Sequence, residues 1–179
     1  MSGRGEKKLM RFAYADPPYL GQGRALYSHD SRCDEYDSLE AHGRLLLRLS
    51  EEFPDGWAYS LSSTTLRLIL PLAPEGVRVM AWVKPFASFK PNVNPAYAWE
   101  PVLVMGGRVK EREEETVRDW VSAPITLERG LAGAKPDGFL FWLLNVLGVR
   151  SGDEVVDLFP GTGAMASAVE RWNRQSSLF

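Results

Sequence analysis

The chain has 179 residues, of which 45% are hydrophobic and 25% charged, and its formal net charge is −2. These values are ordinary for a globular domain with its own core, and they argue against a protein that coats nucleic acid nonspecifically. No apolar run approaches the roughly 18 residues of a membrane span, and the N-terminus lacks the apolar core of a signal peptide. One cysteine and two histidines are too few for a disulfide or a Cys/His zinc cluster, so we expect no metal and a reducing compartment.

The N-terminal half predicts strands that alternate with helices. An apolar, aromatic-rich run at 9–15 predicts a buried strand, which the two following prolines must end because neither can donate to a sheet ladder. Polar residues 20–37 predict a loop long enough to have a function. The next predicted elements are a helix starting at Ser38 and running to Glu52, a strand at 57–62, and a short helix within 63–74.

The C-terminal half continues the alternation. The predicted elements are strands at 77–85 and 96–107, a highly charged loop or short helix within 107–135, an apolar helix at 136–149, a strand at 154–159, and a glycine turn leading into a helix at 160–172. This order predicts an α/β fold with a largely parallel sheet. Ligands of such folds bind at the carboxyl ends of the strands, and two strand ends here have unusual chemistry.

The first strand ends in the sequence DPPY, residues Asp16, Pro17, Pro18 and Tyr19. A proline pair makes a stiff corner that fixes the direction of the carboxylate and of the phenol ring. The carboxylate and the Pro17 carbonyl can accept hydrogen bonds from an amino group, while the ring offers a stacking surface. The motif therefore suits a planar heterocycle with an exocyclic NH₂, although a rigid turn would explain it equally well in isolation.

The last predicted strand ends in DLFPGTG, which contains Asp157, Phe159, Gly161 and Gly163. Glycine permits positive φ and a close approach of backbone to ligand, and the helix that follows presents free N–H groups. No Gly-Lys-Ser/Thr follows, so a Walker phosphate loop is excluded. By itself this pattern is also compatible with a tight structural turn.

Together the two motifs resemble the DNA amino-methyltransferases, which methylate N6 of adenine or N4 of cytosine. DPPY matches the catalytic motif of that family, and DLFPGTG matches its cofactor motif. The catalytic motif comes first, which resembles the permuted (β-type) arrangement. The Lys-Pro at Lys135 with the apolar helix after it, and the strand pair with Glu100, also match, so the resemblance covers most of the chain.

The resemblance implies a Rossmann-like, S-adenosylmethionine-dependent methyltransferase fold, in one domain over 1–179. The substrate would be DNA with an adenine flipped into the pocket. Tyr19 would stack on the base, and Asp16 with Pro17 would hold its amino group at the rigid Pro18 corner. Cofactor-binding residues would be Asp157, Phe159, Gly161 and Gly163, with Asp16, and with Lys135 contacting the methionine carboxylate as a point charge. Aspartate in the first motif position favours adenine.

The sequence departs from the family in two respects. No strand with an acid for the cofactor ribose follows residue 172, so the fold is expected to be truncated there, or completed by a second subunit. The target-recognition region is small, with candidates only at 86–95 and 107–135. A non-catalytic nucleic-acid-binding subunit and an RNA adenine methyltransferase therefore remain alternatives. The family implies a cytoplasmic protein of a bacterium or a phage-infected host.

One histidine and four tryptophans are expected to lie outside the proposed site. His42 is expected to face solvent. Four tryptophans are expected in the core rather than as stacking platforms, namely Trp57, Trp82, Trp99 and Trp142.

Overall fold

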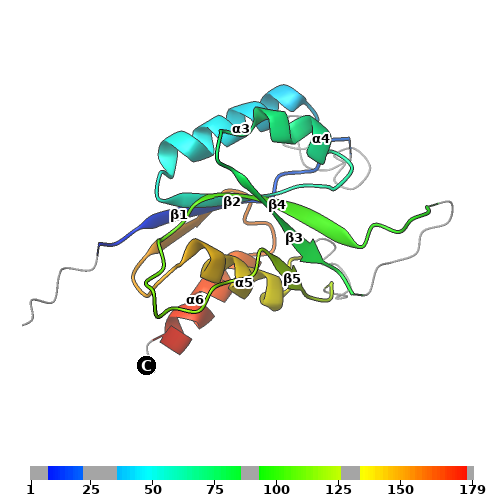
Figure 1. Ribbon diagram of the computed structural model, residues 1–179. Helices are drawn as coiled ribbons and strands as arrows, with labels where there is room; N and C mark the ends of the chain where they lie inside the picture. The colour runs from blue at the N-terminus through cyan, green and yellow to red at the C-terminus, as the bar shows by residue number, and fades with distance from the viewer. Residues whose placement is uncertain (1–7, 22–35, 86–92, 126–133, 177–179) are drawn as a thin grey trace, which may run out of the picture.

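A computed structural model of the chain describes residues 8–21, 36–85, 93–125 and 134–176, so most of the predicted loop at 20–37 lies outside the described residues. Its centre is a six-stranded sheet with helices on both faces (Figure 1). The strands are β1 (Arg11–Ala15), β2 (Gly56–Ser60), β3 (Arg78–Val83), β4 (Trp99–Gly106), β5 (Trp120–Ser122) and β6 (Glu154–Asp157). The helices are α3 (Leu39–Glu52), α4 (Leu66–Ile69), the 3₁₀ helix η1 (Leu70–Leu72), α5 (Asp137–Leu147) and α6 (Ala164–Ser176).

The strand order is β5-β3-β4-β2-β1-β6. β1 pairs in parallel with both β2 and β6, and β3 pairs in parallel with β5. β4 is antiparallel to β2 and to β3, its two neighbours. Five of the six described strands thus run the same way, which confirms the predicted α/β fold with a largely parallel sheet.

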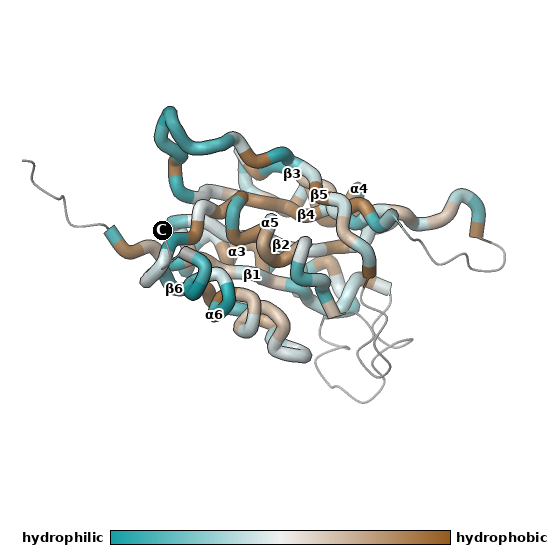
Figure 2. The backbone as a smooth tube through the Cα atoms, turned by 90° about the horizontal axis from the view of Figure 1, so that it is seen from below, coloured by the Kyte–Doolittle hydropathy of each residue, from teal (hydrophilic) through white to brown (hydrophobic). Residues whose placement is uncertain are grey.

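Alternation along the strands divides the core into two clusters, one on each face of the sheet. On β1, Ala13 and Ala15 pack toward α3, whereas Phe12 and Tyr14 pack toward α5 and α6. Figure 1 shows α3 and α4 on one side of the sheet and α5 and α6 on the other. Hydrophobic segments accordingly lie at the middle of the molecule and hydrophilic ones at its outside (Figure 2).

The ends of the main helices follow from local sequence. Ser38 caps α3, and its Oγ accepts a hydrogen bond of 3.2 Å from the Ala41 N–H. α5 ends at Gly148, whose φ of 68° is the left-handed conformation that glycine adopts most easily. None of the helices in the described ranges is both long and apolar enough to cross a membrane.

Three sequence expectations need correction. β5 was not predicted, because a strand of three residues in a charged segment has no periodic pattern. His42 is buried, with 1% of its surface exposed, because it faces Tyr59 of β2 and not solvent. Trp99 is 39% exposed, because it lies at the start of β4, near the end of the sheet.

Candidate active site

The two motif-bearing strands are neighbours. β1 and β6 pair in parallel with Tyr14 opposite Asp157, and the Leu158 N–H donates to the Tyr14 carbonyl at 2.9 Å. The residues that follow both strands therefore lie at the same edge of the sheet. Burial raises the pKa of Asp157, and the nearby Asp16 carboxylate raises it further. A hydrogen bond from the Phe159 N–H lowers this pKa but does not cancel the rise.

Asp16 begins the rigid corner after β1. Its Oδ2 lies 2.9 Å from Lys135 Nζ, and its Oδ1 is buried with no hydrogen-bond partner among the described residues. Pro17, next in the chain, is buried, so the corner is fixed by packing as well as by its ring. A buried carboxylate oxygen without a donor favours a ligand that supplies an N–H.

Glu100 is a second acid at this edge. It lies at the start of β4 opposite Trp82 of β3, and this pairing brings Lys84, just beyond β3, against its Oε1. Its Oε2 accepts a hydrogen bond of 2.8 Å from the Tyr19 hydroxyl and lies 3.6 Å from Lys135 Nζ. Burial alone would raise the pKa of Glu100, but Lys135 and Lys84 outweigh it and lower the pKa, so this carboxylate stays charged.

Tyr19 is held as a neutral phenol. Burial and the neighbouring carboxylates of Asp16 and Glu100 raise its pKa well above the usual value. Its hydroxyl donates to Glu100 and accepts a hydrogen bond of 3.1 Å from Lys135. These two contacts fix the orientation of the ring, which is what a stacking surface requires.

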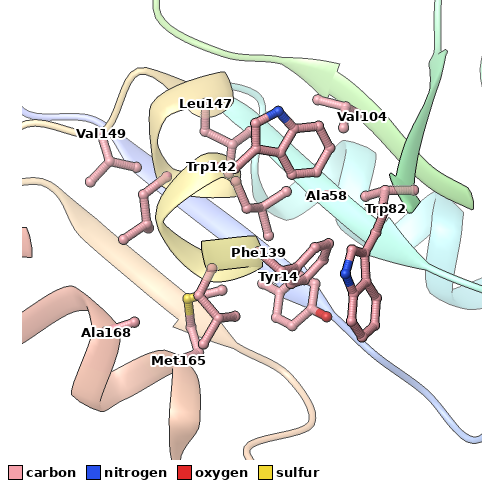
Figure 3. Packing of buried hydrophobic residues seen from close by; sticks show 14 of the residues in the cluster. Tyr14, Ala58, Trp82, Val104, Phe139, Trp142, Leu147, Val149, Met165 and Ala168 are labelled. Atoms are coloured by element: carbon pink, nitrogen blue, oxygen red, sulfur yellow. The ribbon is translucent and has the colours of Figure 1, made fainter. Parts of the chain in front are cut away.

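Three aromatic side chains lie next to the charged side chains of this edge. The Trp82 indole N–H donates to the Ala123 carbonyl at 2.8 Å, and the Trp82 and Phe139 ring centroids are 5.1 Å apart. Tyr14 packs on Phe139 and exchanges a hydrogen bond of 2.9 Å with Ser60. Figure 3 shows Tyr14, Phe139 and Trp82 close together between the sheet and α5.

The turn between β6 and α6 is glycine-dependent. Gly161 has a φ of 44° and Gly163 a φ of 75°, both in the left-handed region. A Cβ built at Gly163 would meet no heavy atom within 4 Å, and one at Gly161 would meet its nearest at 3.7 Å. Glycine is therefore favoured at these two positions by the left-handed backbone and not by lack of room for a side chain. Open space lies beside Gly163, at the start of α6. Phe159 packs edge-on against Tyr36, with 5.0 Å between ring centroids.

The structure thus brings together the acids of both motifs, but it places Lys135 on the DPPY side. The contacts of Lys135 include Asp16, Tyr19 and Glu100. Sequence reasoning did not identify Lys84 or Trp82 as part of this cluster. The sequence pattern that could have identified them is the alternation along β3. This alternation puts residues 82 and 84 on one face of the sheet, and β4 brings a glutamate opposite them. No group of three metal-ligating side chains occurs within the described segments.

The fold is Rossmann-like, and two solved structures share it. The chain resembles M1.HpyAVI, solved as a complex with SAM, at a TM-score of 0.60 and 16% identity, covering 92% of this chain and 79% of that one. It also resembles TTHA0409, a candidate DNA modification methylase from Thermus thermophilus, at a TM-score of 0.55 and 15% identity, covering 92% and 77%. No protein-family profile and no curated protein matches the sequence.

Proposed function

We propose that the protein is an S-adenosylmethionine-dependent DNA methyltransferase that modifies the N6 amino group of adenine. The pairing of β1 with β6 supports this proposal. It brings Asp16 and Pro17, which would bind the amino group of the base, to the same edge of the sheet as the glycine turn. The fold shared with solved methyltransferases agrees with it. The choice of adenine over cytosine rests on aspartate as the first residue of DPPY.

The residues at the glycine turn fit the proposed cofactor. Space is open beside Gly163, and the N-terminal N–H groups of α6 could donate to a polar or anionic group of the cofactor. Asp157 and Phe159 would complete this half. When bound, S-adenosylmethionine supplies an electrophilic methyl group, so the protein needs no covalent nucleophile of its own.

The base half would then work by positioning and electrostatics. Tyr19, with its ring fixed by Glu100, stacks on the flipped base. The Oδ1 of Asp16 accepts a hydrogen bond from the amino group and directs the nitrogen lone pair away from the carboxylate. Methylation leaves one proton in excess on the nitrogen, and Asp16 is placed to accept it.

Target recognition is proposed for the segments near 86–95 and 107–135. Residues 86–92 and 126–133 of these lie outside the described residues. In the described part, Trp120 is 43% exposed and the Arg118 guanidinium lies 5.6 Å from its ring centroid. Such an exposed aromatic–cation pair is a suitable contact for nucleic acid.

The test is methyl transfer from labelled S-adenosylmethionine to mixed-sequence DNA, followed by nucleoside analysis. We expect N6-methyladenine from the wild type and a loss of at least about 100-fold for Asp16→Ala, the range of a removed positioning group. Glu75→Gln, an exposed acid in the turn before β3, is the control and should retain activity. Transfer that Asp16→Ala leaves unchanged would contradict the proposal. Label in competing RNA but not in DNA would favour an RNA methyltransferase, and no transfer would favour a non-catalytic subunit.

A further inference from the structure

The exposed aromatic side chains of the described residues come from one side of the sheet, where β5, β3 and β4 lie next to each other. Tyr97 just before β4, Trp99 at the start of β4 and Trp120 at the start of β5 are 55%, 39% and 43% exposed. No other aromatic side chain of the described residues is exposed to this extent. The Lys84 N–H donates to the Ala98 carbonyl at 2.8 Å, so the β3–β4 ladder continues as far as Tyr97.

The pairing of these strands puts the three rings on one face of the sheet, which we call the aromatic face. Trp99 lies opposite Val83 on one side of β3, and Trp120 lies beside Ala81 on the other side. Side chains at paired positions point to the same face, and so do side chains two residues apart on one strand. Tyr97 therefore points the same way as Trp99.

The helices of the described residues leave the aromatic face uncovered. The apolar cluster beneath α3 takes Leu103 from β4, but it includes no side chain of β3 or β5. α5 packs on the opposite face, where Trp82 of β3 and Val121 of β5 join the other cluster. Val79, which β3 directs to the aromatic face, is 41% exposed. Exposed apolar side chains gathered in this way indicate a surface that binds a partner.

The chemistry of the aromatic face fits unpaired nucleobases. None of the side chains that β3, β4 and β5 direct to this face is acidic, and the Arg118 guanidinium lies 5.6 Å from the Trp120 ring centroid. A cation without neighbouring acids suits the phosphates of a nucleic acid. β4 and β5 are two strand spacings apart, about 10 Å. Trp99 and Trp120 are thus too far apart to hold one base between them, and each has room for a base of its own.

The aromatic face adjoins the edge of the sheet that carries the proposed site. Trp99 directly precedes Glu100, whose side chain points to the other face and accepts the hydrogen bond from Tyr19. Val83, opposite Trp99, ends β3, and β3 runs in the same direction as β1. Trp99 therefore lies at the edge where the DPPY corner begins, and a DNA strand with one base in the site can continue over this edge to the two tryptophans.

We infer that the aromatic face binds unpaired bases of single-stranded DNA next to the base that enters the site. The inference rests on the proposed function, because it takes DNA as the partner. It goes beyond that function by naming the form of DNA that this face selects. Bases in a duplex are stacked on one another and hide their ring faces, so only an unpaired strand can offer them to Trp99 and Trp120.

The test measures binding of one fluorescein-labelled DNA strand of mixed sequence, alone and annealed to its complement, by fluorescence anisotropy. The ratio of the single-strand affinity to the duplex affinity is compared between variants. We expect Trp99→Leu and Trp120→Leu each to weaken binding of the single strand about fivefold or more, the effect of losing one base stack. Binding of the duplex, which depends on phosphate contacts, should change less than about twofold.

Matched substitutions separate stacking from general apolar contact. Trp99→Phe and Trp120→Phe keep an aromatic ring and should retain most of the ratio, whereas leucine is apolar but has no ring to stack. Leu47→Ala removes an exposed apolar side chain of α3, 59% accessible, and should leave the ratio unchanged. Urea unfolding of each variant verifies that it is folded, and the phenylalanine variants still test the inference if a leucine variant is not.

Several outcomes would overturn the inference. A ratio that both leucine variants leave unchanged, or leucine variants that bind as the phenylalanine variants do, would exclude stacking. Tighter binding of an RNA strand with the same sequence would overturn the choice of DNA. A wild-type mass of two chains by light scattering that falls to one chain in Trp120→Leu, with an unchanged ratio, would assign the aromatic face to a second copy.

Methyl transfer tests the proposed function separately. Wild-type protein that shows the expected ratios but transfers no label would support the inference and contradict the proposed function. Label transfer that depends on Asp16, together with ratios that the leucine variants do not change, would do the reverse.

Discussion

At the scale of single residues, the surroundings of His42 in the core favour the neutral form of its imidazole. The ring contacts the Tyr59 hydroxyl and packs edge-on against Tyr36 and Tyr59. Burial lowers the pKa of His42, although the backbone of Tyr36 and the charge of Asp37 act in the opposite direction. Protonation of this side chain is therefore easier in the unfolded chain than in the folded protein.

This difference predicts an acid-sensitive contribution to stability. The unfolded histidine titrates near 6.5, and the folded one below that value. The contribution of His42 is therefore complete above about pH 6.5 and is lost as the pH falls, with a slope of up to about 1.4 kcal/mol per pH unit. Urea unfolding of the wild type and of His42→Phe, from about pH 7.5 down to about pH 5, measures this slope. Equal slopes for the two proteins would contradict the assignment.

At the scale of elements, the turn between β6 and α6 has a constrained backbone. The turn into α6 needs two left-handed glycines, whereas Gly43 lies inside α3 with an ordinary helical conformation. A methyl group at Gly43 would meet the Leu72 side chain at 3.8 Å, which is normal contact. Replacing glycine by alanine should therefore have opposite effects on stability at the two places.

We expect Gly163→Ala to lower the free energy of unfolding by about 1–2 kcal/mol, the cost of a left-handed alanine. Gly43→Ala should raise it by about 0.5–1 kcal/mol, because alanine favours the helix and restricts the unfolded chain. Gly163→Asn is a further check, since asparagine tolerates left-handed φ and should cost less than alanine. Chemical denaturation of the three variants measures these changes, and equal signs for the two alanine variants would be inconsistent with the turn geometry.

The sequence predicted those elements in which the hydrophobic periodicity and the residues that begin or end the element point to the same bounds. Ser38 before an amphipathic run indicated α3, and the proline pair and the glycine turn marked the ends of β1 and β6. β5 and the reversal of β4 depend on long-range pairing that no local pattern encodes. His42 was misassigned because the polar type of a residue does not show that a buried phenol will face it. The cluster around Glu100 likewise required the β3–β4 register, which the sequence alone did not establish.

At the scale of the whole molecule, one buried ion pair joins three distant segments. Arg108, after β4, donates to both carboxylate oxygens of Asp153 at 2.8 and 2.7 Å. Asp153 also accepts hydrogen bonds from the N–H groups of Met10 and Arg150. Burial would raise the pKa of Asp153, but these donors outweigh it and lower the pKa. The side chain of Asp153 is 1% exposed, so no solvent replaces a lost partner.

We expect Asp153→Asn to lower the free energy of unfolding by about 3–5 kcal/mol, the range for a broken buried ion pair. The matched control is Glu154→Gln, which breaks the Arg11 pair on the surface at 2.9 Å and should cost about 0–1 kcal/mol. Because the pKa of Asp153 is depressed on folding, its contribution is complete above about pH 4 and falls at lower pH. Urea unfolding of both variants measures the two costs, and similar values would contradict the role of Asp153.

The pairing of β1 with β6 also has a kinetic consequence. Its contacts join residues 143 positions apart, such as Met10 and Asp153, whereas β1 meets β2 over a separation of about 44 positions. Loop-closure entropy makes the longer contact form later. During synthesis, β1 can dock on β2 and α3 well before residue 157 leaves the ribosome. The DPPY corner after β1 would thus be assembled early, and the edge that it shares with the glycine turn after β6 would be completed only late in folding.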